Sequence, residues 1–241
     1  MNMKVLFDKA TTPPQAAGNN TLSDSGKPHP KAYIEKCVKK FGYNLTVREI
    51  IRGTEDRIDE GIFLNNAAKI MSNFKMTRRG PFKGVGFSRG NGPDNDQGIL
   101  RASWKTIGES VLDLKQFLIS RANTTRSRVL VEISEIERSQ VAEKLWYMLK
   151  RLLPLCMSKT SLGLVGASKL LFSVLPEVAL PVDNIQWRKL FQTVDYSDVI
   201  CLMANEIIEW ERLSGKRIDE CDPNSTLPAI YNVMAMEARE V

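Results

Sequence analysis

Histidine is almost absent from this chain, because His29 is the only one among its 241 residues. Its cysteines, Cys37, Cys156, Cys201 and Cys221, are widely spaced and form no C-x-x-C pair. Zinc and iron–sulfur sites use closely spaced cysteine and histidine ligands, so we expect neither a metal site nor a cofactor. His29 lies between two prolines in a polar segment. A catalytic histidine would have to act from that arm, so we expect no Ser-His-Asp or Cys-His chemistry.

Signals for secretion and for membrane insertion are missing as well. The apolar run Val5–Phe7 is too short for a signal peptide, and the least charged stretch, residues 161–182, still contains two prolines and charged side chains. Cys37 and Cys201 fall at apolar positions of helical patterns, which favours buried reduced thiols over a disulfide framework. We therefore expect a cytoplasmic protein without a membrane partner.

Acidic residues are missing between Lys69 and Arg89, where all the charges are positive. Phenylalanines are interleaved with these cations and glycines follow them. Cations attract phosphates through counterion release, and aromatic rings offer stacking surfaces for bases, so this basic loop predicts contact with DNA or RNA. The residues expected to make it are Lys69, Lys75, Arg78, Arg79, Lys83, Phe87 and Arg89. A solvated surface segment without a ligand is the alternative interpretation.

Helical patterns dominate the rest of the chain. Apolar residues recur at helical spacing over 34–41, 62–74, 104–121, 134–154, 167–175, 183–191, 195–213 and 226–240. Thr46–Glu49 and Ser134–Glu137 have the form of capping boxes, and Pro154 is expected to end the helix that Ser134 opens. Residues 128–133 are rich in β-branched side chains, but no second strand is evident to pair with them.

These patterns predict a mainly α protein, a compact bundle of several helices. The segment Thr11–Pro30 is rich in Pro, Gly, Ser and Asn, so residues 1–30 are predicted to form a flexible arm. The basic loop, placed at 75–98, divides the remainder into an N-terminal helical lobe, 31–98, and a C-terminal helical lobe, 99–241. Hydrophobic residues at 43% and charged residues at 26% are typical of globular proteins, whereas a net charge of +6 favours polyanions.

A second informative string begins with Gly163, Gly166 and Lys169 and continues, after a helix, as Leu180-Pro181-Val182-Asp183 with Arg188. Two glycines before a helix expose backbone N–H groups to a phosphate, and Lys169 is expected to add charge in the first turn. The string resembles the helix-hairpin-helix DNA glycosylase superfamily, in which a glycine hairpin precedes a helix and an L-P-V-D segment. This resemblance covers residues 163–188 only.

The resemblance implies a catalytic role for Asp183, since the aspartate of that segment is the family's catalytic carboxylate at a cleft between two helical lobes. Lys169 is a second catalytic candidate by its proximity, while Gly163 and Gly166 would contact phosphate. A purely structural alternative exists, because Asp183 and Gln186 also fit a helix N-cap with its capping-box partner, and both glycines also fit turns.

Three functions follow as hypotheses. The first is a DNA base-excision enzyme of glycosylase or lyase type that uses Asp183, with Phe82 or Phe87 filling the space of an extruded base. The second is a non-catalytic nucleic-acid-binding protein whose basic loop contacts the phosphate backbone. The third is a helical assembly protein with a protein partner.

Overall fold

The computed structural model describes residues 5–8, 26–40, 48–50, 57–78, 80–85, 97–122, 126–159 and 161–238. Within them helices dominate, and the β pairing is limited to two isolated bridges, Phe7 with Pro28 and Ser158 with Ser161. The α-helices are α1 (Lys31–Lys40), α3 (Glu60–Asn73), α4 (Gly98–Arg121), α5 (Val129–Glu132), α6 (Glu135–Cys156), α7 (Leu164–Phe172), α8 (Tyr196–Ser214) and α9 (Leu227–Ala238). Shorter helical turns are η1 (Met76–Arg78), η2 (Gly80–Phe82), η3 (Arg126–Arg128), η4 (Gln186–Phe191) and η5 (Ile218–Cys221). The predicted mainly α fold is confirmed.

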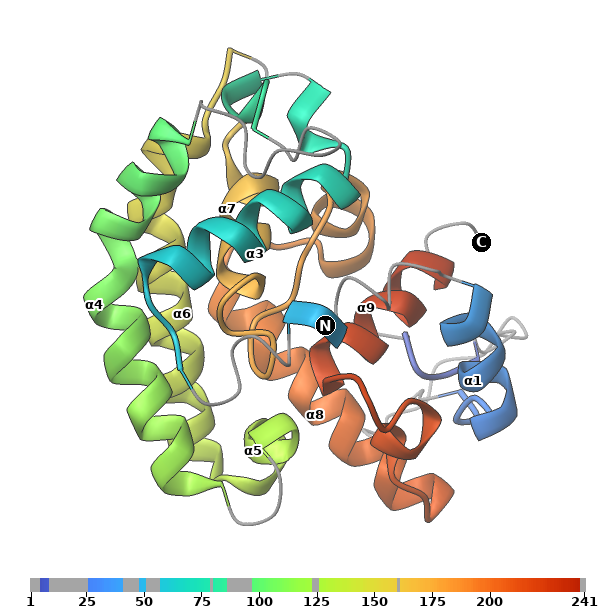
Figure 1. Ribbon diagram of the computed structural model, residues 1–241. Coiled ribbons are helices and arrows are strands. Elements are labelled where there is room, and N and C mark those ends of the chain that lie inside the picture. The colour runs from blue at the N-terminus through green and yellow to red at the C-terminus, as the bar shows by residue number, and fades with distance from the viewer. Residues whose placement is uncertain are drawn as a thin grey trace, which may run out of the picture.

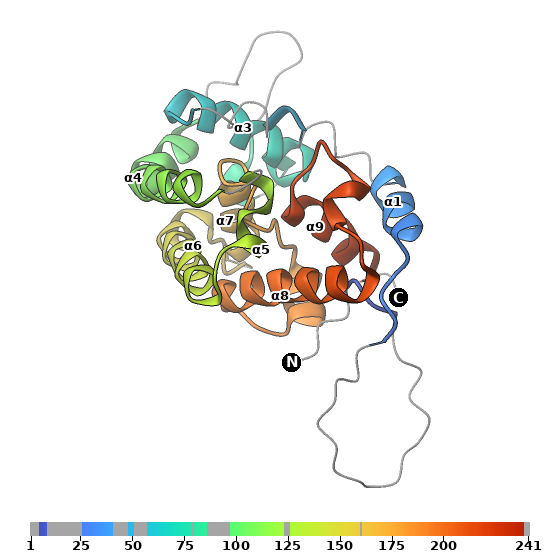
Figure 2. The same cartoon turned by 90° about the horizontal axis from the view of Figure 1, so that it is seen from below.

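Helix α6 contacts α4, α7 and α8, and it runs antiparallel to α4 along one side of the molecule (Figure 1). Helix α3 contacts α4 and α7, while α1 packs on α9. Viewed from below, α7 lies in the interior with α3, α4, α6, α8 and α9 arranged around it (Figure 2). Every residue of α7 is buried, as expected of a helix that is apolar on nearly all sides.

The buried apolar side chains form one cluster that spans the predicted lobe boundary. Phe63 and Met71 of α3 belong to it together with Leu118 of α4 and Leu170 of α7. The structure thus joins residues from 31–98 and 99–241 in a single core. In the described part of the chain, every helix falls short of the length or the apolar character that crossing a membrane requires.

The start of α6 confirms the capping box predicted at Ser134. Its hydroxyl accepts a hydrogen bond from the Glu137 N–H at 3.2 Å, and the Glu137 carboxylate accepts one from the Ser134 N–H at 3.2 Å. The predicted end at Pro154 is wrong, because α6 continues to Cys156. Proline lacks the N–H group that would donate to a carbonyl of the preceding turn. The residues after Pro154 keep their N–H groups and can therefore complete the last turn.

Residues 128–133 form η3 and the short helix α5 rather than a strand. Arg128 explains this choice, because its guanidinium is buried among three carboxylates. It contacts Glu132 at 3.2 Å, Glu211 at 2.8 Å and Asp219 at 2.8 Å. The helical turn brings Glu132 next to Arg128, whereas in an extended strand the two residues would share a face but lie about 13 Å apart.

The flexible arm predicted over residues 1–30 is contradicted at residues 5–8 and 26–30, while residues 1–4 lie outside the described residues. Val5 and Leu6 are buried, and their N–H groups both donate to the carboxylate of Glu206 at 2.6 Å. His29 is also held in place, because its Nδ1 lies 2.9 Å from a carboxylate oxygen of Asp8. Burial of the imidazole lowers the pKa of His29. The middle of the arm, residues 9–25, lies outside the described residues.

Candidate nucleic-acid interface and adjoining pocket

The described part of the basic loop forms a compact turn after α3. The Gly84 N–H donates to the Thr77 carbonyl at 3.2 Å, which closes the segment that contains η1 and η2. Lys75, Arg78 and Lys83 project from this turn as exposed side chains. None of the three forms an ion pair with another described residue. A fixed turn therefore presents three cations to solvent.

The described aromatic residues of the loop face the protein instead of the solvent. Phe82 is 1% exposed and packs on Gly166 of α7, and Phe74 is half-buried beside Lys169. The hypothesis that Phe82 fills the space of an extruded base is therefore wrong, because its ring already fills a gap in the core. Its burial anchors the basic turn to α7.

The other cations predicted in the loop have different outcomes. Lys69 lies on α3, where its Nζ forms an ion pair with Glu49 at 3.0 Å, so its charge is partly neutralised. Arg79, Phe87 and Arg89 lie outside the described residues. For these three, contact with nucleic acid stays a prediction.

A second acid-free stretch, residues 144–176, lies at the same end of the molecule. It contains the C-terminal half of α6, the hairpin around the Ser158–Ser161 bridge, and α7. The fold brings this stretch against the basic turn, because η2 packs on α6 and α3 packs on α7 (Figure 1). Lys159 is exposed on the hairpin. We call Lys75, Arg78, Lys83 and Lys159 the basic end.

The outer side of α6 extends this positive surface. Lys144, Lys150 and Arg151 are exposed, and the last two lie over the rings of Trp146 at 5.2 Å and Tyr147 at 5.7 Å. These residues were not predicted from the sequence, although the lack of any Asp or Glu from 144 to 176 indicates a positively charged stretch.

Several cations elsewhere in the described chain have carboxylate partners. Lys31 pairs with Glu220 at 2.8 Å, and Arg217 pairs with Asp219 at 2.6 Å. Three other ion pairs likewise join cations of α1, η3 and α8 to nearby carboxylates. Exposed lysines such as Lys36, Lys105 and Lys216 also lack an ion pair among the described residues, so what distinguishes the basic end is the absence of Asp and Glu from the two stretches that form it.

The two hairpin glycines are required by packing. Gly163 has a φ of 83°, and a Cβ there would lie 2.9 Å from the Cys156 carbonyl carbon. Its N–H donates to the Ser161 hydroxyl at 3.2 Å. A Cβ at Gly166 would lie 2.7 Å from a ring carbon of Phe82. The structure accounts for both glycines through close backbone packing, and Gly166 is buried away from any phosphate.

Lys169 lies in the last turn of α7, so the predicted charge in the first turn of this helix is wrong. The helix begins at Leu164, and Lys169 is only 4% exposed. Its ammonium lies 4.2 Å from the centre of the Phe74 ring, a cation–π distance. This contact ties α7 to the end of α3.

Asp183 caps the helical segment that leads into η4. Its Oδ1 accepts hydrogen bonds from the N–H groups of Ile185 at 2.9 Å and Gln186 at 2.8 Å, while Gln186 Oε1 accepts from the Asp183 N–H at 2.7 Å. The capping interpretation is therefore confirmed as geometry. Asp183 is half-buried and adjoins Asn184, which lines a surface pocket. Its catalytic role stays a hypothesis.

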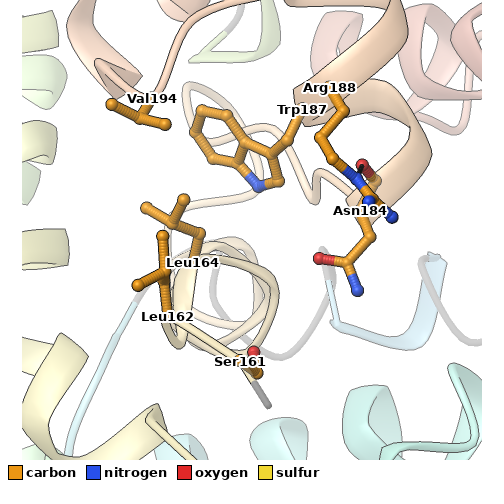
Figure 3. A pocket seen from close by; sticks show the side chains of 7 residues that line it. All are labelled: Ser161, Leu162, Leu164, Asn184, Trp187, Arg188 and Val194. Carbon is orange, nitrogen blue, oxygen red and sulfur yellow. Dashed lines mark hydrogen bonds between the residues drawn. The ribbon is translucent and has the colours of Figure 1, made fainter.

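That pocket has a volume of about 260 Å³ and lies between the hairpin and η4 (Figure 3). Its walls are Ser161, Leu162, Leu164, Asn184, Trp187, Arg188 and Val194. The indole of Trp187 stands across from the two leucines, with its nitrogen directed toward the space between them and Asn184 (Figure 3). Trp187 is 4% exposed, and its Nε1 donor is buried without a hydrogen-bond acceptor among the described residues.

Packing and hydrogen bonds on the side away from the pocket fix the position of Trp187. Its ring packs against Tyr196 with ring centres 6.0 Å apart. The Tyr196 hydroxyl accepts from the Leu180 N–H and donates to the Leu180 carbonyl, both at 2.7 Å. Gln186, the residue before Trp187, donates to the buried Asn232 amide oxygen at 3.1 Å. The ring therefore has a fixed position in the pocket.

Comparisons of the chain with models of protein families, with curated proteins and with solved structures find no match. The resemblance of residues 163–188 to helix-hairpin-helix glycosylases is thus neither supported nor refuted by a relative. Among the described residues, no group of three or more His, Cys, Asp or Glu side chains is placed to hold a metal ion.

Proposed function

We propose that this protein binds nucleic acid and that the basic end contacts the sugar–phosphate backbone. The observation that carries the proposal is the convergence of two acid-free stretches, 61–93 and 144–176, at one end of a helical protein. Lys75, Arg78, Lys83 and Lys159 are exposed there without ion-pair partners among the described residues. Cations in this state keep mobile counterions, and a polyanion that displaces them gains free energy.

The spread of the cations supports a long ligand over a small one. They belong to different segments, namely the turn after α3, η1, the turn after η2 and the hairpin after α6, and none of the four lines the pocket formed by Ser161, Trp187 and their neighbours. A small acidic metabolite needs convergent donors in a pocket, whereas a phosphate chain needs cations spaced along a surface. Lys150 and Arg151 of α6 would lengthen the same surface.

The geometry favours binding over base excision as the primary proposal. One carboxylate oxygen of Asp183 accepts hydrogen bonds from two backbone N–H groups, as the side chain of a helix N-cap does. Base excision by Asp183 remains a hypothesis that requires the carboxylate to act in addition to its capping role. A variant that keeps the cap and removes the charge separates the two, as described in the Discussion.

The test is a binding titration over salt with single-stranded DNA, duplex DNA and RNA. The variant Lys75→Gln, Arg78→Gln, Lys83→Gln, Lys159→Gln removes the basic end. Its matched control, Lys36→Gln, Lys39→Gln, Lys105→Gln, Lys216→Gln, removes the same formal charge from exposed lysines elsewhere. For the basic-end variant, we expect the log–log salt slope to fall by about 0.9 per lost contact on duplex DNA and about 0.7 on single strands.

Equal weakening by both quadruple variants would show that net charge, and not the basic end, drives binding. That result would overturn the proposal, as would a lack of binding to all three nucleic acids at low salt. Circular dichroism of both variants checks that the helices remain intact.

A further inference from the structure

The pocket beside the hairpin contains a buried donor with no acceptor, which is costly unless a ligand supplies one. The Trp187 indole can only donate a hydrogen bond, and leaving such a donor unpaired in an apolar setting lowers stability. Buried polar groups without partners are few in native proteins, and a functional role is one of the explanations for them. The pocket therefore calls for a ligand atom that accepts a hydrogen bond.

The residues that line the pocket restrict the shape and polarity of the rest of that ligand. Leu162, Leu164 and Val194 are apolar, and the flat indole forms the facing wall (Figure 3). Because the volume of about 260 Å³ is below the roughly 300–1,000 Å³ usual for drug-sized ligands, the pocket holds about one ring system. Arg188 lies at the rim and offers a guanidinium to an attached anion.

The pocket is also placed within reach of the basic end. Ser161 and Leu162 belong to the same hairpin as Lys159, so a phosphate chain held at Lys159 passes close to the pocket entrance. Leu162, which lines the pocket, is 67% exposed. A chain with flat, acceptor-bearing rings and regularly spaced anions fits both features.

We infer that the Trp187 pocket binds one unstacked base of a single-stranded nucleic acid, with its phosphate at Arg188. The inference rests on the proposed function. Every base carries ring-nitrogen or carbonyl acceptors for the indole N–H, and bases splayed out of a single strand are available to protein pockets. The Asn184 amide, which both donates and accepts, is the second polar group at the ring edge.

The test follows the indole N–H directly by NMR of the full chain labelled with ¹⁵N-tryptophan. The chain has four tryptophans, and Trp187→Phe assigns the resonance of interest. The probes are dTMP, thymidine and deoxyribose 5-phosphate. We expect dTMP to move the Trp187 N–H signal downfield, thymidine to do so with weaker affinity, and deoxyribose 5-phosphate to leave it in place.

Variants separate the contacts. Trp187→Phe keeps an aromatic wall and removes the donor, so binding of dTMP, followed by a methyl probe of Leu164, should weaken about fivefold. Arg188→Ala should weaken dTMP but not thymidine, whereas Lys189→Ala, an exposed neighbour outside the pocket lining, should change neither. Leu162→Trp should block the pocket without unfolding the protein, because position 162 is exposed.

The outcomes distinguish this inference from the proposed function. If duplex DNA binds with the expected salt slope but dTMP leaves the Trp187 signal unmoved, the pocket inference is overturned and the proposed function stands. An unchanged affinity for single-stranded DNA in Leu162→Trp would also overturn it. If the protein binds none of the three nucleic acids at low salt while dTMP still shifts the Trp187 signal, the proposed function fails and the pocket serves a free nucleotide.

Discussion

The ring of Phe82 lies directly against the backbone of Gly166, so that a Cβ at position 166 would be 2.7 Å from ring carbon Cε2. This contact lets the basic turn rest on α7. It also links the two acid-free stretches, because Phe82 belongs to the first and Gly166 to the second. The basic end therefore depends on a glycine that never reaches the surface.

Gly166→Ala should destabilise the protein by about 1–3 kcal/mol, the usual cost of forcing an extra methyl group into a packed core. The measurement is urea unfolding followed by circular dichroism. Gly61→Ala is the matched control, since it also lies in a helix and its Cβ would meet only Asp59 Oδ1 at 3.4 Å. If both alanine variants unfold at the same urea concentration, the Phe82 contact is not as close as described.

Two substitutions at Asp183 separate capping from chemistry. Asp183→Asn keeps a side-chain oxygen for the Ile185 and Gln186 N–H groups, so its stability should change little, whereas Asp183→Ala should lose about 0.5–2 kcal/mol. Thermal unfolding measures both. Should wild-type protein release bases from damaged DNA and Asp183→Asn lose that activity at unchanged stability, the carboxylate is catalytic. Retained activity in Asp183→Asn would exclude that role.

The helix caps at Ser134 and Asp183 could be predicted from residues close together in the sequence. The predictions for the N-terminal arm and for Phe82, which the structure contradicts, failed because they depend on contacts between residues far apart in the sequence. The box at Ser134 involves residues three positions apart, so its pattern is visible in the sequence. The burial of Val5 and Leu6 is not, because it depends on Glu206, which is remote in sequence. The burial of Phe82 could not be predicted from the sequence either. Its aromatic ring is consistent with a nucleic-acid-binding loop, but in the fold it packs against Gly166, which is remote in sequence.

The candidate site was predictable only in part for the same reason. An excess of cations from Lys69 to Arg89 is a property of the sequence, but the neutralisation of Lys69 by Glu49 depends on how the chain folds. The Trp187 pocket arises where the hairpin meets η4, and neither segment alone shows it.

A buried ion pair joins α4 to the connection after α7, with Lys115 Nζ 3.0 Å from Glu177 Oε1. Lys115→Met alone should cost about 3–5 kcal/mol, because it leaves the Glu177 charge buried without its partner. The double variant Lys115→Met, Glu177→Leu should recover most of this loss. Urea unfolding of the two single variants and the double variant measures the coupling. Additive losses in the double variant would show that the two side chains do not interact.

Stability should depend on pH through Glu206, whose pKa is raised by burial above its usual 4.5. A raised pKa means that the fold favours the protonated form, so this stabilisation is complete below the unfolded-state pKa and is lost as pH rises through the folded-state pKa. The free energy of unfolding of wild type relative to Glu206→Gln should therefore fall as the pH rises above about 4.5, the usual pKa of the carboxyl group. A constant difference would show that the Val5, Leu6 and Tyr231 donors compensate the charge fully.

Lys69 and Arg78 should differ in nucleic-acid binding although both lie in the acid-free stretch. Arg78 is exposed without an ion-pair partner among the described residues, so Arg78→Gln should lower the salt slope on duplex DNA by about 0.9. Lys69 already contacts Glu49, so Lys69→Gln should lower it less. Glu49→Gln releases Lys69 and should strengthen binding at low salt. Because Glu49 is exposed, this gain cannot be attributed to a rearranged core, and equal slopes for Lys69→Gln and Arg78→Gln would contradict the assignment of the basic end.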